Sequence, residues 1–313
     1  MSLIDHFING GSPNFKDLSS TSVYNPATGE ETSKVVSGTF NCIESAVKSS
    51  LKAFPEWSNM TPLVRSRKMF KLKEIIENRQ NELAKLITLE HGKTFDDALG
   101  EIARGLEVVE FSCGITSHLA GSYTSNVGRS IDSWSDYQPM GVCAGITPFN
   151  FPVMVPLWMF PVAIACGNCF ILKPSERDPS SSRLLAEMVI EAGIPAGVLN
   201  VVQGGKVAVD AILQHKDISG VSFVGSTPIA HYVYMEAAKY GKKVQAMGGA
   251  KNHMVVMPDA DMNLVGDAIM GSVFGSAGER CMAISVVVPV GKETGDKIKE
   301  IITPKIQNLK IGS

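Results

Sequence analysis

From Gly141 onward, short apolar runs alternate with longer segments of mixed character. The apolar runs have the length of buried strands, and the segments between them are long enough to form helices. This alternation is typical of a parallel sheet, because parallel strands need a long, usually helical, connection. The sequence therefore predicts an α/β domain with strands over 142–146, 169–172, 198–202 and 220–223 and helices over 183–192, 207–214 and 228–240.

The part of the chain before Gly141 has a different character. Residues 1 to about 38 are predicted to form an extended arm with turns at Gly10-Gly11-Ser12-Pro13 and Asn25-Pro26. Helices are expected to follow, one of them from Phe95 to about Leu119. The polar, β-prone stretch Ser122–Gln138 is predicted to form a hairpin with its turn near Asn126-Val127-Gly128.

Composition and charge exclude several classes of protein. The 313 residues can bury an ample core, and 44% hydrophobic against 19% charged residues is ordinary for a soluble protein. A net charge of −2 provides no basic field for nucleic acid or for an anionic membrane. The longest apolar stretch, Phe151–Cys166, contains three prolines and is shorter than the ~20 residues that span a bilayer. The N-terminus lacks the apolar core of a signal peptide, so we expect a cytoplasmic protein.

Six cysteines do not form a dense disulfide framework, which fits a reducing compartment. Cys166 and Cys169 have the spacing of a redox dithiol, but that motif normally opens a helix after a strand. Here it follows an apolar helix and leads into a strand, so the redox interpretation is the less favoured one. No Cys and His spacing resembles a zinc site, and we expect no metal.

Cys281 ends a segment of small residues, Gly275-Ser276-Ala277-Gly278, followed by Glu279 and Arg280. A thiolate is a strong nucleophile, and a neighbouring guanidinium favours the thiolate form. The small residues leave room for a substrate carbonyl to approach the sulfur. Taken alone, Cys281 is better explained as a buried structural cysteine, because most free cysteines are buried.

The predicted sheet carries no G-x-G-x-x-G fingerprint, so another device must hold any nucleotide. Lys173 directly follows a strand, and with Glu176 it can hydrogen-bond a ribose. Gly225 and Ser226 open the next helix, where backbone N–H groups suit a pyrophosphate. Taken singly, Lys173 is a solvated surface lysine and Ser226 is a plain N-cap.

Five motifs occur in the order found in the aldehyde dehydrogenase superfamily, which the sequence resembles over nearly its whole length. They are Asn25-Pro26-Ala27-Thr28-Gly29, Pro148–Pro152, Leu172–Glu176, Phe223–Thr227 and Gly278–Cys281. The segments Glu279–Ala283, Gly249–His253 and Glu176-Arg177 resemble the CoA-acylating methylmalonate-semialdehyde dehydrogenase branch.

The resemblance implies an aldehyde dehydrogenase-like α/β fold with a Rossmann-like NAD-binding domain over 1–121 and 139–250. The hairpin over 122–138 is expected to project and to contribute to a homo-oligomer, a dimer or tetramer. Residues 251–313, with a strand over 252–257 and a helix over 262–274, are expected to form an incomplete catalytic domain. Family members continue well beyond Ser313, with the rest of that domain and a late glutamate that holds the nicotinamide ribose, so the chain is expected to be truncated.

The resemblance also implies roles for individual residues. Cys281 is the nucleophile that forms a thioester, and the amide of Asn150 stabilises the oxyanion together with the Cys281 backbone N–H. NAD is bound by Thr147, Phe149, Lys173, Glu176, Arg177, Gly225, Ser226 and Gly248. A Glu176 carboxylate on the ribose 2′-hydroxyl favours NAD over NADP. Arg104 and Arg280 match arginines that bind the substrate carboxylate, although Arg104 is equally well explained as an exposed helix residue.

One departure from the general family pattern concerns the acyl acceptor. Hydrolytic members carry a glutamate base where this chain has Ala246, which cannot activate water. CoA is therefore the expected acceptor, and methylmalonate or malonate semialdehyde the expected substrate. The alternatives are a hydrolytic aldehyde dehydrogenase, a truncated inactive relative that binds nucleotide or partner subunits, and a dithiol redox protein. The sequence does not discriminate between the two semialdehydes.

Overall fold

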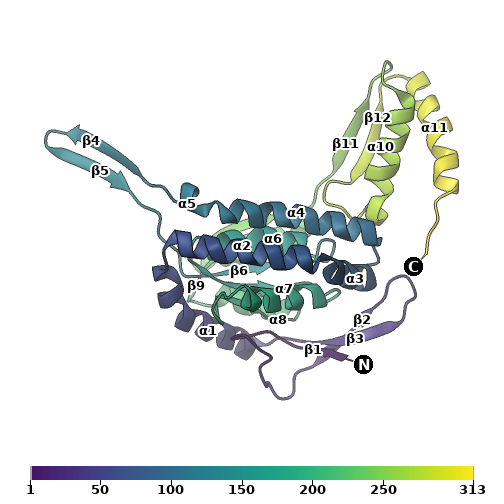
Figure 1. Cartoon of the computed structure of the whole chain (residues 1–313). Coiled ribbons are helices and arrows are strands. Elements are labelled where there is room, and N and C mark those ends of the chain that lie inside the picture. Colours follow the sequence, from purple (N-terminus) through teal and green to yellow (C-terminus); the bar gives the residue numbers. More distant parts are fainter. Residues whose placement is uncertain (1, 313) are drawn as a thin grey trace.

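A five-stranded parallel sheet lies at the centre of the computed structural model, which describes residues 2–312 (Figure 1). Its strand order is β10-β9-β6-β7-β8. The strands are β6 (Val142–Ile146), β7 (Cys169–Lys173), β8 (Leu199–Val201), β9 (Ile218–Val224) and β10 (Lys243–Met247). The predicted α/β fold is confirmed. Sequence analysis missed β10, because this edge strand lacks the continuous apolar run of the buried strands.

The order in which strands are added to this sheet reverses at β6. It runs outward from β6 through β7 to β8, then returns to the other side of β6 to add β9 and β10. Loops that leave β6 and β9 at their carboxyl ends therefore separate to opposite faces. In open α/β sheets, ligands bind in the crevice that forms at such a switch point.

Helices cover both faces of the sheet and the adjoining N-terminal region (Figure 1). The connecting helices are α6 (Met154–Ala165), α7 (Ser180–Glu191), α8 (Lys206–Gln214) and α9 (Thr227–Lys239). The earlier ones are α1 (Phe40–Asn59), α2 (Pro62–Asn78), α3 (Gln80–His91), α4 (Phe95–Cys113) and α5 (Ile115–His118). The single helix expected from Phe95 to about Leu119 is wrong at its C-terminal end. The observed helix α4 ends at Cys113, and the short helix α5 follows after Gly114. No helix within residues 2–312 is long and apolar enough to cross a membrane.

Two regions before the sheet differ from the sequence prediction. The extended arm contains a three-stranded sheet of β1 (Ser2–Ile4), β2 (Ser20–Tyr24) and β3 (Glu31–Val36). The projecting hairpin consists of β4 (Ser122–Gly128) and β5 (Ile131–Ser135), so its turn lies at residues 129 and 130. Asn126 has a positive φ of 51°, but it lies within a register shift between Thr124 and Gly128 of β4 and not in the turn.

A second lobe extends away from the sheet (Figure 1). It contains the parallel strands β11 (Asn252–Val256) and β12 (Ile284–Pro289), the helices α10 (Met262–Phe274) and α11 (Lys292–Gln307), and the 3₁₀ turn η1 (Gly275–Gly278). Val256, Ile269 and Ile298 form its small core. Cys281 lies in the connection between η1 and β12, so this lobe carries the cysteine toward the larger domain.

Candidate functional site

A cavity of roughly 550 Å³ opens at the carboxyl end of the central sheet. The segments that follow β6, β7 and β9 form its walls, and the connection from η1 to β12 forms its far side. Ten residues that sequence analysis singled out line it together: Thr147, Phe149, Asn150, Lys173, Glu176, Arg177, Gly225, Ser226, Gly248 and Cys281. The fold therefore brings the predicted nucleophile, oxyanion donor and nucleotide-binding residues into one space.

One end of this cavity is built for a polar ligand. Lys173 is buried at the end of β7, and its Nζ lies 3.1 Å from Glu176 Oε2. Burial acts to raise the pKa of Glu176, but the Lys173 ammonium, a backbone hydrogen bond and the Arg177 guanidinium together outweigh it and hold that pKa below its usual value. Glu176 is therefore ionised at neutral pH and can accept hydrogen bonds from hydroxyl groups.

Ser226 occupies the N-cap position of α9, yet its hydroxyl makes no cap hydrogen bond. The hydroxyl and the first N–H groups of this 13-residue helix thus remain available to a ligand. The simple explanation of Ser226 as a plain N-cap does not account for this geometry.

The segment that leads to Cys281 has a tightly bent backbone. Ser276, Ala277 and Gly278 have positive φ values of 51°, 52° and 76°, and Cys281 follows three residues later with an exposed side chain. Positive φ is uncommon for residues other than glycine, and such conformations cluster at functional sites. Asn150 Nδ2 donates a hydrogen bond of 2.6 Å to the backbone oxygen of Glu279. Because a carboxamide has two N–H donors, one remains for a ligand.

The two other candidate thiols lie in a different environment. Cys169 is buried within β7, and burial, with Cys143 nearby, raises its pKa to about 12. Cys166 ends α6, and burial raises its pKa also, although Arg65 opposes the rise. A thiol with a raised pKa is a poor nucleophile at neutral pH, so this pair disfavours a dithiol redox function.

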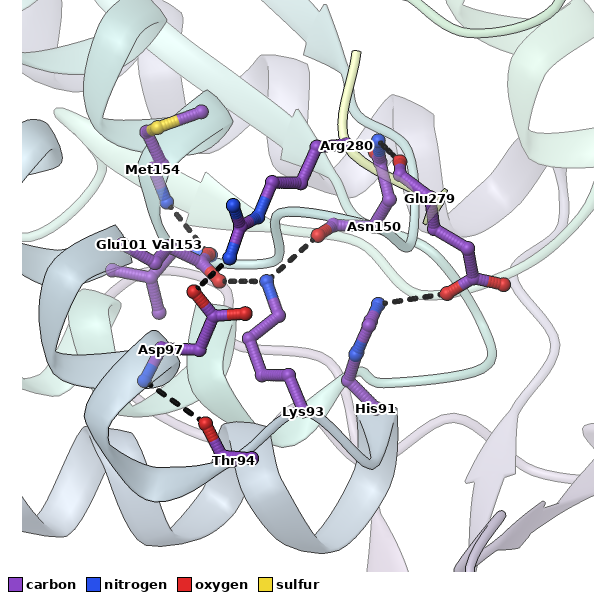
Figure 2. Close-up of polar contacts among 10 residues, drawn as sticks. All are labelled: His91, Lys93, Thr94, Asp97, Glu101, Asn150, Val153, Met154, Glu279 and Arg280. Carbon is purple, nitrogen blue, oxygen red and sulfur yellow. Dashed lines mark hydrogen bonds and ion pairs between the residues drawn. The ribbon is translucent and has the colours of Figure 1, made fainter. Parts of the chain in front are cut away.

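Neither predicted carboxylate-binding arginine lines the cavity. Arg280 forms an ion pair with Asp97 of α4 (Figure 2). It also donates a 3.3 Å hydrogen bond to the backbone oxygen of Gly271. Its guanidinium also lies against Gly275, where an added Cβ would be 2.8 Å from its Cζ. Arg104 lies on the exposed side of the same helix.

Sequence analysis missed a group of polar residues from α3, α4 and the loop between them. His91, Lys93, Asp97 and Glu101 contact the segments that carry Asn150 and Cys281 (Figure 2). No motif marks these four residues, because each contact joins residues far apart in the chain. Glu279 belongs to the Gly278–Cys281 motif, but sequence analysis gave it no role, and it lines the cavity with Cys281.

Comparisons with known proteins show the family. Residues 15–313 match the model of the aldehyde dehydrogenase family. The chain belongs to the aldehyde dehydrogenase family. A malonate-semialdehyde dehydrogenase of Pseudomonas aeruginosa is 53% identical over 313 residues, which are 100% of this chain and 63% of that protein.

Solved aldehyde dehydrogenase structures share the fold. The methylmalonate-semialdehyde dehydrogenase of Oceanimonas doudoroffii has a TM-score of 0.98 and 54% identity, over 100% of this chain and 64% of its own. An NAD⁺ complex of a Bacillus cereus aldehyde dehydrogenase has a TM-score of 0.94 and 30% identity, over 99% and 64%. The chain thus spans less than two thirds of the length of each of these three relatives.

Proposed function

We propose that this chain carries the nucleophile and the nucleotide site of an NAD-dependent, CoA-acylating semialdehyde dehydrogenase. Its substrate is malonate or methylmalonate semialdehyde. The observation that carries the proposal is the single cavity lined by Cys281, Asn150 and the eight predicted nucleotide-binding residues. The names of the Pseudomonas and Oceanimonas relatives support the semialdehyde class.

The residues that line the cavity fit NAD. Lys173 and Glu176 would hydrogen-bond the adenosine ribose, and Ser226 with the start of α9 would hold the pyrophosphate. Thr147, Phe149 and Gly248 would face the nicotinamide, with Arg177 stacked over the Phe149 ring at 4.9 Å. When bound, NAD supplies the hydride acceptor for the oxidation. The anionic Glu176 disfavours the additional phosphate of NADP.

Cys281 begins the chemistry by attack on the aldehyde carbon, which forms a carbon–sulfur bond and places a negative charge on the former carbonyl oxygen. The free N–H of Asn150 and the Cys281 backbone N–H would stabilise that oxyanion. Oxidation of this thiohemiacetal leaves a thioester on Cys281.

The residue that replaces the hydrolytic base supports CoA as the acceptor. Ala246 belongs to β10 and packs on the apolar core of the domain. Glu279 is the carboxylate that lines the cavity near Cys281. A carboxylate takes a proton from a thiol, pKa ~8.5, far more readily than from water, pKa ~15.7. The CoA thiol would therefore displace Cys281, and loss of CO₂ would give acetyl-CoA or propanoyl-CoA.

Arg280 is the stronger of the two candidates for binding the substrate carboxylate. It is adjacent to Cys281, and its contacts with Asp97 and Gly271 leave other N–H donors of the guanidinium available. Arg104 would reach the substrate only if the ligand extends along α4.

The projecting hairpin supports a homo-oligomer. Tyr123, Ile131 and Trp134 on its strands are 66%, 58% and 75% exposed, which is unusual for large apolar side chains of a monomer.

Product analysis tests the proposal. NADH and the acyl products are measured with and without CoA, in this chain and in a fusion that adds the remaining third of the Pseudomonas relative. We expect CoA-dependent NADH formation and acyl-CoA in the fusion, and weak or no turnover in the 313-residue chain. Rapid formation of free acid without CoA would instead indicate a hydrolytic enzyme, and a fusion that binds NAD without turnover would indicate an inactive relative.

A further inference from the structure

A buried ion pair lies beneath the loop that carries Asn150 (Figure 2). Lys93, in the loop after α3, places its Nζ 2.6 Å from Glu101 Oε2 of α4. The two side chains are 1% and 0% exposed. Compared with apolar residues of similar size, a buried ion pair rarely adds net stability. The hydrogen bonds that the pair makes to its surroundings are therefore informative.

Both ions bind the backbone of the same loop. Lys93 Nζ donates a 2.9 Å hydrogen bond to the backbone oxygen of Asn150 and lies 4.3 Å from the centre of the Phe151 ring. Glu101 Oε1 accepts hydrogen bonds of 2.8 and 3.1 Å from the backbone N–H groups of Val153 and Met154. These N–H groups begin α6, which has no side-chain cap from its own N-cap residue.

The pair thus holds the loop on both sides of Phe151. The side chain of Asn150 is held at its other end by the Glu279 oxygen. With its backbone oxygen and its amide both engaged, Asn150 has little freedom to move. An apolar pair of the same volume would fill the space but would leave the Asn150 oxygen and the first N–H groups of α6 without these partners.

We propose that Lys93 and Glu101 are positioning residues for the oxyanion donor Asn150. This inference rests on the proposed function in one respect, the role of the Asn150 amide. The pair does not touch the substrate; it fixes the backbone from which the donor projects. Displacement of a reacting group by ~1 Å can cost about 100-fold in rate.

Two reactions of Cys281 separate this role from a general structural one. With p-nitrophenyl acetate, the thiolate attacks the ester carbonyl, an oxyanion forms, and its collapse expels nitrophenolate and leaves an acetyl thioester. With iodoacetamide, the thiolate displaces iodide directly and no oxyanion forms. Both rates are measured on the peptide that contains Cys281 by mass spectrometry, and neither reaction needs NAD or CoA.

The test variant is Lys93→Met with Glu101→Gln, which removes both charges together and keeps a side-chain oxygen for the start of α6. We expect acylation of Cys281 to slow by about 10- to 100-fold, with alkylation changed by less than about 2-fold. Asn150→Ala should have the same selective effect. The triple variant should be no slower than Asn150→Ala, because residues that act as a unit are not additive.

Lys242→Met is the matched control. Lys242 is also a buried lysine that donates to a backbone oxygen, that of Ile218 at 2.8 Å, but it precedes β10 and does not contact the Asn150 loop. Its ratio of acylation to alkylation should equal that of the native chain. If the double variant does not fold, Lys93→Arg replaces it, since it keeps the charge and displaces the donor; the same selective loss is expected.

Three results would overturn the inference. Equal losses in acylation and alkylation would show a structural role only. Additive losses with Asn150→Ala would show that the pair does not act through Asn150. No selective loss in Asn150→Ala would remove the oxyanion role itself, and the positioning role with it. Acyl-CoA formation is measured in a separate assay from acylation and alkylation of Cys281. Failure of the proposed CoA-dependent reaction is therefore distinguishable from these three results.

Discussion

His91 should make the protein less stable as the solution is acidified. It ends α3, its side chain is 3% exposed, and its ring stacks on Phe149 with 5.9 Å between ring centres. Burial, assisted by the Lys93 ammonium, lowers the pKa of His91 from 6.5 to about 4, although Asp97 opposes the shift. Nε2 lies 3.3 Å from Glu279 Oε2, and at neutral pH this is a contact of a neutral imidazole with a carboxylate.

The sign and size of the effect follow from this shift. Between pH 6.5 and pH 4 the unfolded chain binds a proton at His91 that the folded chain does not, so stability falls as the pH falls. At ~1.36 kcal/mol per pKa unit, the contribution lost is about 1.4 kcal/mol at pH 5.5 and about 2.5 kcal/mol at pH 4.5. Above pH 7 the contribution is fully present.

Urea unfolding at about pH 7.5, 6.5, 5.5 and 4.5 measures this effect, with His91→Gln as the variant that cannot titrate. The free energy of unfolding of the native chain should fall relative to that of His91→Gln by the amounts above. His231→Gln, on the exposed side of α9, controls for the loss of an imidazole as such. A difference between native and His91→Gln that stays constant over this range would refute the reasoning. It would mean that Glu279 pairs with the protonated imidazole and cancels the cost of burial.

Two further predictions concern the chemistry in the fusion protein. Cys281→Ala should abolish NADH formation from the semialdehyde, whereas Cys166→Ala and Cys169→Ala should retain most of it, because partial or full burial raises the pKa of these two thiols. Activity that survives in Cys281→Ala would exclude this nucleophile. Arg104→Leu should raise KM for methylmalonate semialdehyde far more than for propanal if Arg104 binds the carboxylate, and equal effects on both aldehydes would assign it to the helix surface.

Local sequence patterns predicted much of the central domain. The strands β6 and β7 were predicted correctly from their apolar runs, because a strand buried on both faces needs apolar residues at every position. The edge strand β10 and the strands of the N-terminal sheet alternate or are polar, so they carry no such run. The hairpin turn was misplaced because Asn126 tolerates a positive φ at an irregular position as well as in a turn.

The sequence by itself predicted the fold class, the family and ten of the residues that line the cavity, because these ten lie in short segments that resemble motifs of the family. Only the tertiary structure decided that Arg280 pairs with Asp97, that Glu279 faces the cavity, and that Lys93 and Glu101 hold the Asn150 loop. The physical reason is sequence separation: Arg280 and Asp97 are 183 residues apart, and Lys93 and Asn150 are 57 apart. Contacts of this kind leave no periodic or local trace in the chain, since their partners become neighbours only when the sheet and α4 have packed together.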